Sequence, residues 1–237
     1  LHGRQSFLEF HEAQSLRALV DHAKIDHPNI SPATYIVNQL NDYLDRQREV
    51  ILGPDLSDRR NVMQSLIKAP DVQDAIRKES IRSKISMIDA EHKAIGFVNE
   101  IASDYSASAV RFADMALTRL WTQLYDGVEV HNFNTVRELV KDYEVIYTPC
   151  HRSHIDYLLL SYVIYKRGLM VPYIAAGDNL NMPFVGQLLR GGGAFFIRRS
   201  FRGNALYTSV FKEYLFSILS RNTPLEYFIE GGRSRTG

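Results

Sequence analysis

Apolar residues recur at helical spacing through the first half of the chain. Ser31 followed by Pro32 predicts the start of one helix, and Asp71 predicts the cap of a longer one that runs from residue 72 to about residue 96. Further helices are expected from residue 57 or 58 to 69 and over 107–124. We therefore predict that residues 1–125 form an all-helical lobe whose apolar faces pack as a bundle core.

After residue 125 the pattern changes to short apolar runs that alternate with helical stretches. The expected strands are 128–131, 145–147, 172–175, 194–197 and 225–229. The expected helices are 135–141, 154–166, 184–189 and 203–220. Such alternation is typical of an α/β sheet, in which reactive groups lie at strand ends. Residues 126–237 are accordingly predicted to form an α/β catalytic domain.

The composition is that of a globular protein with a localised basic segment. The 237 residues are 45 % apolar and 23 % charged, with a net charge of +1. Residues 186–237 nevertheless hold eight Lys or Arg against three Glu. This imbalance favours one anion site over general nucleic-acid binding, so no nucleic-acid partner is expected.

Two further features limit the class of protein. Cys150 is the only cysteine, which excludes an intrachain disulfide framework. No apolar run approaches the roughly 18–20 residues that span a bilayer, so membrane contact is expected to be peripheral. The chain lacks an initiator Met and stops at Gly237 inside a Gly- and Arg-rich motif, so we expect a fragment whose catalytic domain is incomplete.

The most informative motif follows the expected strand 145–147. His151 and Asp156 lie five residues apart in the run His-Arg-Ser-His-Ile-Asp. A histidine titrates near neutral pH, and a carboxylate can fix its tautomer and stabilise its cation. On one continuous helix the two side chains would not share a face, so His151 must lie in the turn before the helix that carries Asp156. This pair is the candidate catalytic site for deprotonating a hydroxyl group.

Two other interpretations of the motif stay open. Ser153 and Asp156 have the spacing of a capping box, so the carboxylate could serve the helix alone. His151 and His154 could bind a metal, although no third ligand of matching type is obvious nearby, and we expect no metal site.

Arginines gather after two later strands. Arg198 and Arg199 follow one another and should point to opposite faces of a strand. Arg233 and Arg235 lie in a glycine-rich turn together with Glu230. Guanidinium groups bind phosphate through a planar fork, so these segments predict a phosphorylated substrate. The glycines at 191–193 match no dinucleotide fingerprint and are expected to permit a tight turn or a close backbone approach.

Together these blocks resemble the glycerolipid acyltransferase superfamily. His151 to Asp156 is similar to its His-x4-Asp block, residues 193–199 to its second block, and Glu230 to Ser234 to its third. The variants present here are most similar to those of the bacterial membrane-bound members that acylate glycerol 3-phosphate. The resemblance implies a central mixed, largely parallel sheet flanked by helices, preceded by a helical lobe.

The resemblance also implies an activity and its participants. A fatty acyl group would pass from acyl-ACP or acyl-CoA to the 1-hydroxyl of sn-glycerol 3-phosphate, at the cytoplasmic face of the bacterial inner membrane, with no other cofactor. His151 would act as general base and Asp156 would orient it. The implied substrate-binding residues are Arg199, Glu230, Gly231, Arg233, Ser234 and Arg235.

Three rivals remain at this point. The same chemistry could act on dihydroxyacetone phosphate, a metal-dependent hydrolase could use His151 and His154, or the chain could be a lipid- or anion-binding module without activity. Phe195, Phe196, Phe201 and Phe211 could line an acyl groove or simply pack in the core.

Overall fold

The computed structural model describes residues 15–52, 59–221 and 223–234. Contacts divide the chain into two compact units, residues 1–52 and 53–237. In the first unit, helix α1 (Leu16–Asp26) precedes helix α2 (Pro32–Leu52). The hydroxyl of Ser31 accepts a hydrogen bond from the Thr34 N–H (3.2 Å), and Pro32 opens α2 as the sequence predicted.

In the described residues of the second unit four helices come first. They are α3 (Arg59–Lys68), α4 (Pro70–Ser83), α5 (Met87–Ile101) and α6 (Ala107–Leu124). The last three start at local signals: Pro70 at the first position of α4, and the hydroxyls of Ser86 and Ser106 before α5 and α6. The predicted single helix over 72–96 is wrong. Lys84 adopts the left-handed conformation (φ 55°) and ends α4, and the Ser86 hydroxyl then caps α5. Expected residues 57 and 58 lie outside the described residues.

Within the described residues, four short strands form one parallel sheet in the order β1-β4-β2-β3. The strands are β1 (Ile146–Tyr147), β2 (Tyr173–Gly177), β3 (Ala194–Ile197) and β4 (Leu225–Glu226). Every described pairing is parallel, so the expected mixed character is not seen. The α/β fold is confirmed, with helices joining successive strands.

Helices connect and cover the sheet. α7 (Phe133–Asp142) precedes β1, and α8 (Asp156–Lys166) follows it. A 3₁₀ turn (Asp178–Leu180) and α9 (Val185–Gly191) lie between β2 and β3, and α10 (Ala205–Leu219) precedes β4. The predicted strand 128–131 is wrong, because this stretch is an unpaired connection between Gly127 (φ 110°) and Asn132 (φ 57°).

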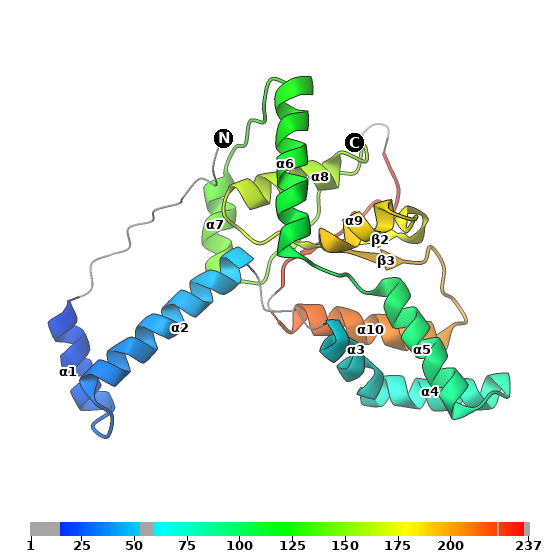
Figure 1. The fold of residues 1–237 in the computed structure, drawn as a ribbon, viewed down its shortest axis with the longest axis horizontal. Coiled ribbons are helices and arrows are strands. Elements are labelled where there is room, and N and C mark those ends of the chain that lie inside the picture. Colours follow the sequence, from blue (N-terminus) through cyan, green and yellow to red (C-terminus); the bar gives the residue numbers. More distant parts are fainter. Residues whose placement is uncertain (1–14, 53–58, 222, 235–237) are drawn as a thin grey trace. The chain divides into compact units, whose positions relative to one another are not determined.

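The two faces of the sheet differ in what they carry. Helices α3, α4, α5 and α10 pack together on one face, and α6, α8 and α9 lie on the other (Figure 1). The main core joins α3–α5 to α10 and to strand residues that include Tyr173, Phe195 and Leu225. Helices from both sides of residue 125 thus share one core, and the predicted boundary at 125/126 stays a prediction about where the catalytic domain begins.

Gly193 explains part of the three-glycine run. It precedes β3 with φ +104°, and a Cβ there would lie 2.9 Å from the carbonyl oxygen of Pro172. Only glycine allows this backbone conformation and this approach without strain, as the sequence predicted. The close approach fixes β3 beside β2.

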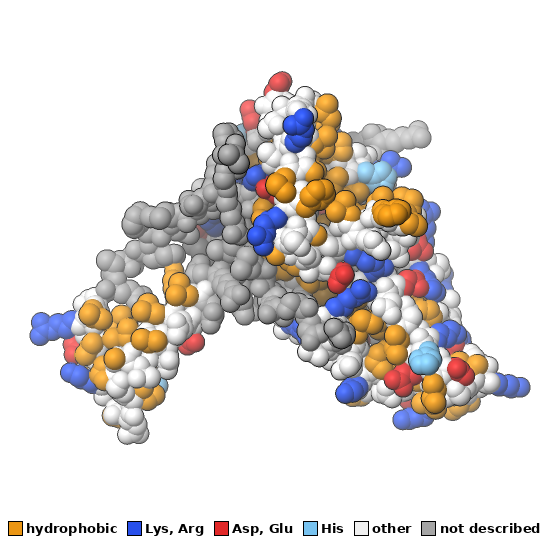
Figure 2. Space-filling view, in the orientation of Figure 1, with side chains coloured by type: hydrophobic (Ala, Val, Ile, Leu, Met, Phe, Trp, Pro, Cys, Tyr) orange, Lys and Arg blue, Asp and Glu red, His pale blue; other side chains and the backbone are white. Residues whose placement is uncertain are grey.

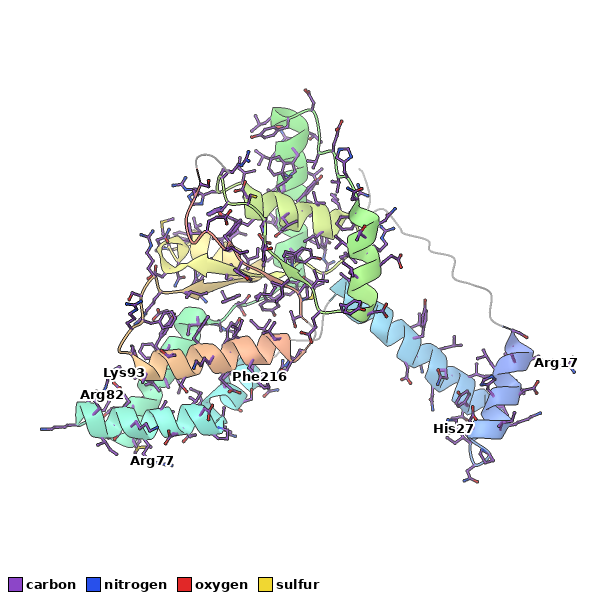
Figure 3. The ribbon with its side chains drawn as sticks, turned by 180° about the vertical axis from the view of Figure 1, so that it is seen from behind. Arg17, His27, Arg77, Arg82, Lys93 and Phe216 are labelled. Carbon is purple, nitrogen blue, oxygen red and sulfur yellow. The ribbon has the colours of Figure 1, made fainter. Side chains whose placement is uncertain are left out.

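A buried ionic cluster ties α4 to α5. Glu79 is 3 % exposed, and its carboxylate accepts hydrogen bonds from Lys93 (2.5 Å), Arg82 (2.6 Å) and Ser83 (2.9 Å). Figure 3 shows Arg82 and Lys93 at the same end of the helical layer, with Arg77 directed elsewhere. The hydrogen bond from Lys93, aided by those from Ser83 and Arg82, lowers the pKa of Glu79 despite its burial.

We expect Glu79→Gln to lower the free energy of unfolding by about 1–3 kcal/mol at pH 7, because hydrogen bonds to a charged group are lost. A carboxyl whose pKa is lowered by folding stabilises above its unfolded pKa and loses that contribution as pH falls through its folded pKa. The difference between Glu79→Gln and wild type should therefore shrink between pH 5 and pH 2. Urea unfolding across that range checks this, and Glu91→Gln, an exposed position on α5, should leave stability unchanged at both ends.

Candidate active site

His151 and Asp156 come together at the end of β1 and the start of α8. The chain leaves β1, turns through His151, and enters α8 at Asp156, its first helical residue. The His151 Nδ1 lies 3.4 Å from the Asp156 Oδ2. His151 lies in the turn before the helix, as the spacing required. Its ring therefore has a carboxylate at Nδ1, which favours a tautomer whose Nε2 can accept a proton.

Asp156 also organises the turn that carries His151. Its Oδ2 accepts hydrogen bonds from the N–H groups of Arg152 (2.6 Å) and Ser153 (2.7 Å), and its Oδ1 from the Ser153 hydroxyl (3.2 Å). The predicted cap at Ser153 is wrong, because the residue that precedes α8 is Ile155 and the helix has no side-chain cap. Asp156 thus bonds the turn before α8 and contacts His151 at the same time.

The Asp156 carboxylate is held in its charged form. Burial opposes ionisation, but the Ser153 and Arg152 N–H groups, the His151 ring and the Ser153 hydroxyl together lower its pKa. A carboxylate that stays charged at neutral pH can stabilise an imidazolium that forms beside it. The pair therefore has the electrostatics of a general base and its partner.

The third motif encloses His151 from the side of β4. The Phe228 ring lies 4.0 Å from the His151 ring, centroid to centroid. The Glu230 carboxylate accepts a hydrogen bond from the His151 N–H (3.2 Å), and the Ser234 N–H donates to the His151 carbonyl (2.7 Å). Gly231 makes the intervening turn possible with φ 62°. Two motifs about 80 residues apart thus form one structural unit.

A cavity of about 800 Å³ opens beside this unit. His151, Arg199, Gly231 and Arg233 all line it. Asp156 and Glu230 do not line the cavity themselves, but their carboxylates contact His151. The backbone N–H of Ser234 also donates to His151. Arg235 lies outside the described residues. The structure thus brings the candidate residues of all three motifs to one place, while their roles stay predictions.

The two adjacent arginines have different partners. Arg198 donates to both carboxylate oxygens of Glu100 (2.5 and 2.6 Å) and lies against the rings of Phe97 and Tyr207. Arg199 is exposed and forms no ion pair with any residue that the structure describes. Both line the cavity, but of the two only the Arg199 guanidinium has no carboxylate partner among the described residues. Arg233 is likewise exposed and without an ion pair among the described residues.

The apolar part of the cavity is formed by helices whose apolar faces were predicted from sequence to pack in the core. Its walls include one side of α6 and one side of α8, and Figure 2 shows hydrophobic side chains gathered along α6 and beside α9. The lining side chains from α6 and α8 include Val110, Phe112, Ala113, Leu117, Leu158 and Tyr162. The four phenylalanines considered from sequence are not among the lining residues. Phe195 and Phe196 are each 1 % exposed, and Phe201 and Phe211 pack against the core.

The structure also bears on a metal site, on membrane-crossing helices and on Cys150. His154 lines the cavity, but the described residues contain no group of three His, Cys, Asp or Glu side chains placed to hold a metal ion. None of the helices in the described part of the chain is long and apolar enough to cross a membrane. Cys150 is exposed and does not line the cavity.

Comparison with known proteins gives one family-model match and several similar proteins that share one name. Residues 127–237 match the model of the acyltransferase family. Over 235 residues, 99 % of this chain, it is 49 % identical to proteins named glycerol-3-phosphate acyltransferase from Ectopseudomonas mendocina (strain ymp) and Pseudomonas fluorescens (strain SBW25). It is 48 % identical to the protein of the same name from Pseudomonas entomophila (strain L48). The chain spans 28 % of the length of each of these relatives.

Proposed function

We propose that the protein transfers a fatty acyl group to the 1-hydroxyl of sn-glycerol 3-phosphate, since residues 127–237 match the model of the acyltransferase family. The product is 1-acylglycerol 3-phosphate, and the donor is acyl-ACP or acyl-CoA. The relatives named above support the acceptor. One observation carries the proposal. A single cavity is lined by His151, by Arg199 and Arg233, which form no ion pair with a described residue, and by apolar helix faces.

The chemistry follows from these side chains. The His151 Nε2 takes the proton of the 1-hydroxyl while that oxygen attacks the thioester carbonyl. The tetrahedral intermediate then collapses, the carbon–sulfur bond breaks, and the imidazolium returns its proton to the leaving thiolate. Asp156 stabilises the imidazolium between these steps. No acyl-enzyme forms, so Cys150 has no part in the reaction.

Substrate binding divides between charge and apolar surface. Arg199 and Arg233 hold the phosphate by forked hydrogen bonds, together with Arg235. Glu230 and Ser234, with Gly231 between them, fix the turn that faces the glycerol. The acyl chain lies against α6 and α8. The imidazole suffices as base, so the proposal needs no metal ion and no cofactor besides the acyl donor.

The membrane is the proposed second partner. A long acyl chain and a lipid product favour exchange with a bilayer, and we place the protein peripherally at the cytoplasmic face of the inner membrane. Within the basic segment 186–237 the proposal assigns Arg199, Arg233 and Arg235 to a small phosphate site, and no nucleic acid is part of it.

The proposal predicts a strict choice of acceptor. In the longest version of the protein that contains this chain, sn-glycerol 3-phosphate should accept a palmitoyl group from palmitoyl-CoA or palmitoyl-ACP. Glycerol, which lacks the phosphate, should react at least about 100-fold more slowly, because its charge-assisted contacts with the arginines are lost. Product analysis by mass spectrometry checks this. A faster reaction with dihydroxyacetone phosphate would transfer the assignment to that acceptor, and acyl transfer to none of the three would overturn it.

A further inference from the structure

Glu226 is a fully buried carboxyl group that the proposed mechanism does not use. It ends β4, where it lies in register between Tyr147 of β1 and Ile174 of β2. Its exposure is 0 %, and neither carboxyl oxygen has a hydrogen-bond partner among the described residues. An ionised carboxylate in such a place is very costly, so Glu226 must be paired or uncharged.

Its position relates it to the catalytic pair. Glu226, Phe228 and Glu230 alternate along the segment that leaves β4, and the last two contact His151. The negative charge of Asp156 acts on Glu226 from α8. Tyr147 faces it from β1, and β2 offers the apolar Ile174 at the paired position. The charged neighbour is therefore a second carboxylate and not a cation.

Both influences favour the protonated form. Burial first, and then the charge of Asp156, raise the pKa of Glu226 to about 8. Glu226 acts in turn on Tyr147, whose pKa burial and this neighbour raise to about 12. At pH 7 a neutral carboxyl, Glu226, therefore lies behind the charged Asp156, while the exposed Glu230 carboxylate contacts the His151 N–H from the other side.

We propose that Glu226 is a positioning residue for the His151–Asp156 pair, in which its buried, uncharged carboxyl adds no negative charge behind the Asp156 carboxylate and so lets Asp156 keep its place at the imidazole Nδ1. Loss of the Glu226 proton would place a second negative charge behind that carboxylate. That charge would repel the Asp156 carboxylate from its place in the turn, and the His151 ring would lose the partner that orients its Nδ1. Turnover would then decline at alkaline pH. Only the effect on turnover rests on the function proposed above.

The pH dependence of the stability of the fold should also reflect the protonation of Glu226. A carboxyl whose folded pKa is raised contributes stability below its unfolded pKa and loses it as pH rises through the folded pKa. Thermal stability of the wild-type chain should therefore fall between about pH 5 and pH 9 by an amount that Glu226→Gln removes, since the amide does not titrate. Glu144→Gln, at an exposed position just before β1, is the matched control and should keep the wild-type decline.

Nuclear magnetic resonance tests the proposal without turnover. In a chain labelled at glutamate Cδ, one resonance should titrate near pH 8 in wild type and in Glu144→Gln and be absent from Glu226→Gln. The ¹⁵N shifts of the His151 ring should change at the same pH, because Glu226 then acts on its Asp156 partner, and this change should be lost only in Glu226→Gln. If all glutamates titrate below about pH 6, or if the His151 curve is the same in both variants, the proposal is overturned. Should Glu226→Gln not fold, the wild-type titration still decides.

Turnover provides a separate readout in the longest version of the protein. The pH above which the rate declines should shift upward in Glu226→Gln and stay unchanged in Glu144→Gln. A decline that does not move overturns the proposal even if glycerol 3-phosphate is acylated. Conversely, a Glu226 titration near pH 8 without any acyl transfer removes the proposed function and leaves the buried acid established.

Discussion

Replacement of His151 by alanine should reduce acyl transfer by about 10²–10⁴-fold while the fold is kept. The Asp156 carboxylate already has two backbone N–H donors and a hydroxyl donor, so the turn before α8 does not depend on the imidazole. The loss should therefore fall on kcat, because the hydroxyl group keeps its place but has no base to accept its proton. Initial rates with sn-glycerol 3-phosphate and palmitoyl-CoA measure it.

His154→Ala is the matched control for this change. His154 lines the same cavity three residues later, but it has no carboxylate partner among the described residues. Its replacement should leave kcat within about threefold of wild type. Equal losses for both variants would favour the two-histidine metal site. Unchanged turnover in His151→Ala, with a normal circular dichroism spectrum, would favour a binding module whose His–Asp pair only shapes a helix start.

Replacement of Arg199 or Arg233 by alanine should raise the KM for glycerol 3-phosphate by about 10–100-fold, the range expected when a hydrogen bond to a charged group is lost. Both guanidinium groups line the cavity and neither is tied to a described carboxylate. Lysine should restore little of the affinity, because a point charge does not reproduce the fork. The KM for palmitoyl-CoA should change far less, which separates phosphate binding from a general defect.

Arg198→Ala should behave differently although it neighbours Arg199. Its guanidinium is bonded to Glu100 on α5 and packed between Phe97 and Tyr207. This change should lower the melting temperature and leave the KM for glycerol 3-phosphate nearly unchanged. The reverse result, with KM raised by Arg198→Ala and not by Arg199→Ala, would contradict the assignment of the phosphate site.

The helices were largely readable from sequence because their signals are local. The helix over 107–124 and the strand 194–197 have the predicted bounds. Local signals also led to one wrong helix, 72–96. Helix α4 ends at Lys84 in the left-handed conformation, and no glycine in the sequence indicated that end. The strand runs at 145–147 and 225–229 shortened to two residues each, because pairing depends on neighbours and not on apolar character alone.

The sequence predicted the reactive side chains of the site, but it did not predict the apolar side chains that line the cavity. Motif spacing placed His151 before α8 and drew attention to Arg199 and Arg233. The apolar face of α6 carries the same periodicity whether it packs in a core or lines a cavity, so sequence alone could not separate the two. Glu226 was also missed, because a carboxyl group is conspicuous only when its surroundings are known to be buried.

A crystal structure of the protein soaked with sn-glycerol 3-phosphate tests the central claim most directly. The account predicts the phosphate between Arg199 and Arg233, with the 1-hydroxyl about 3 Å from the His151 Nε2. A phosphate bound away from both arginines, or a glycerol whose hydroxyl groups all lie beyond the reach of His151, would contradict it.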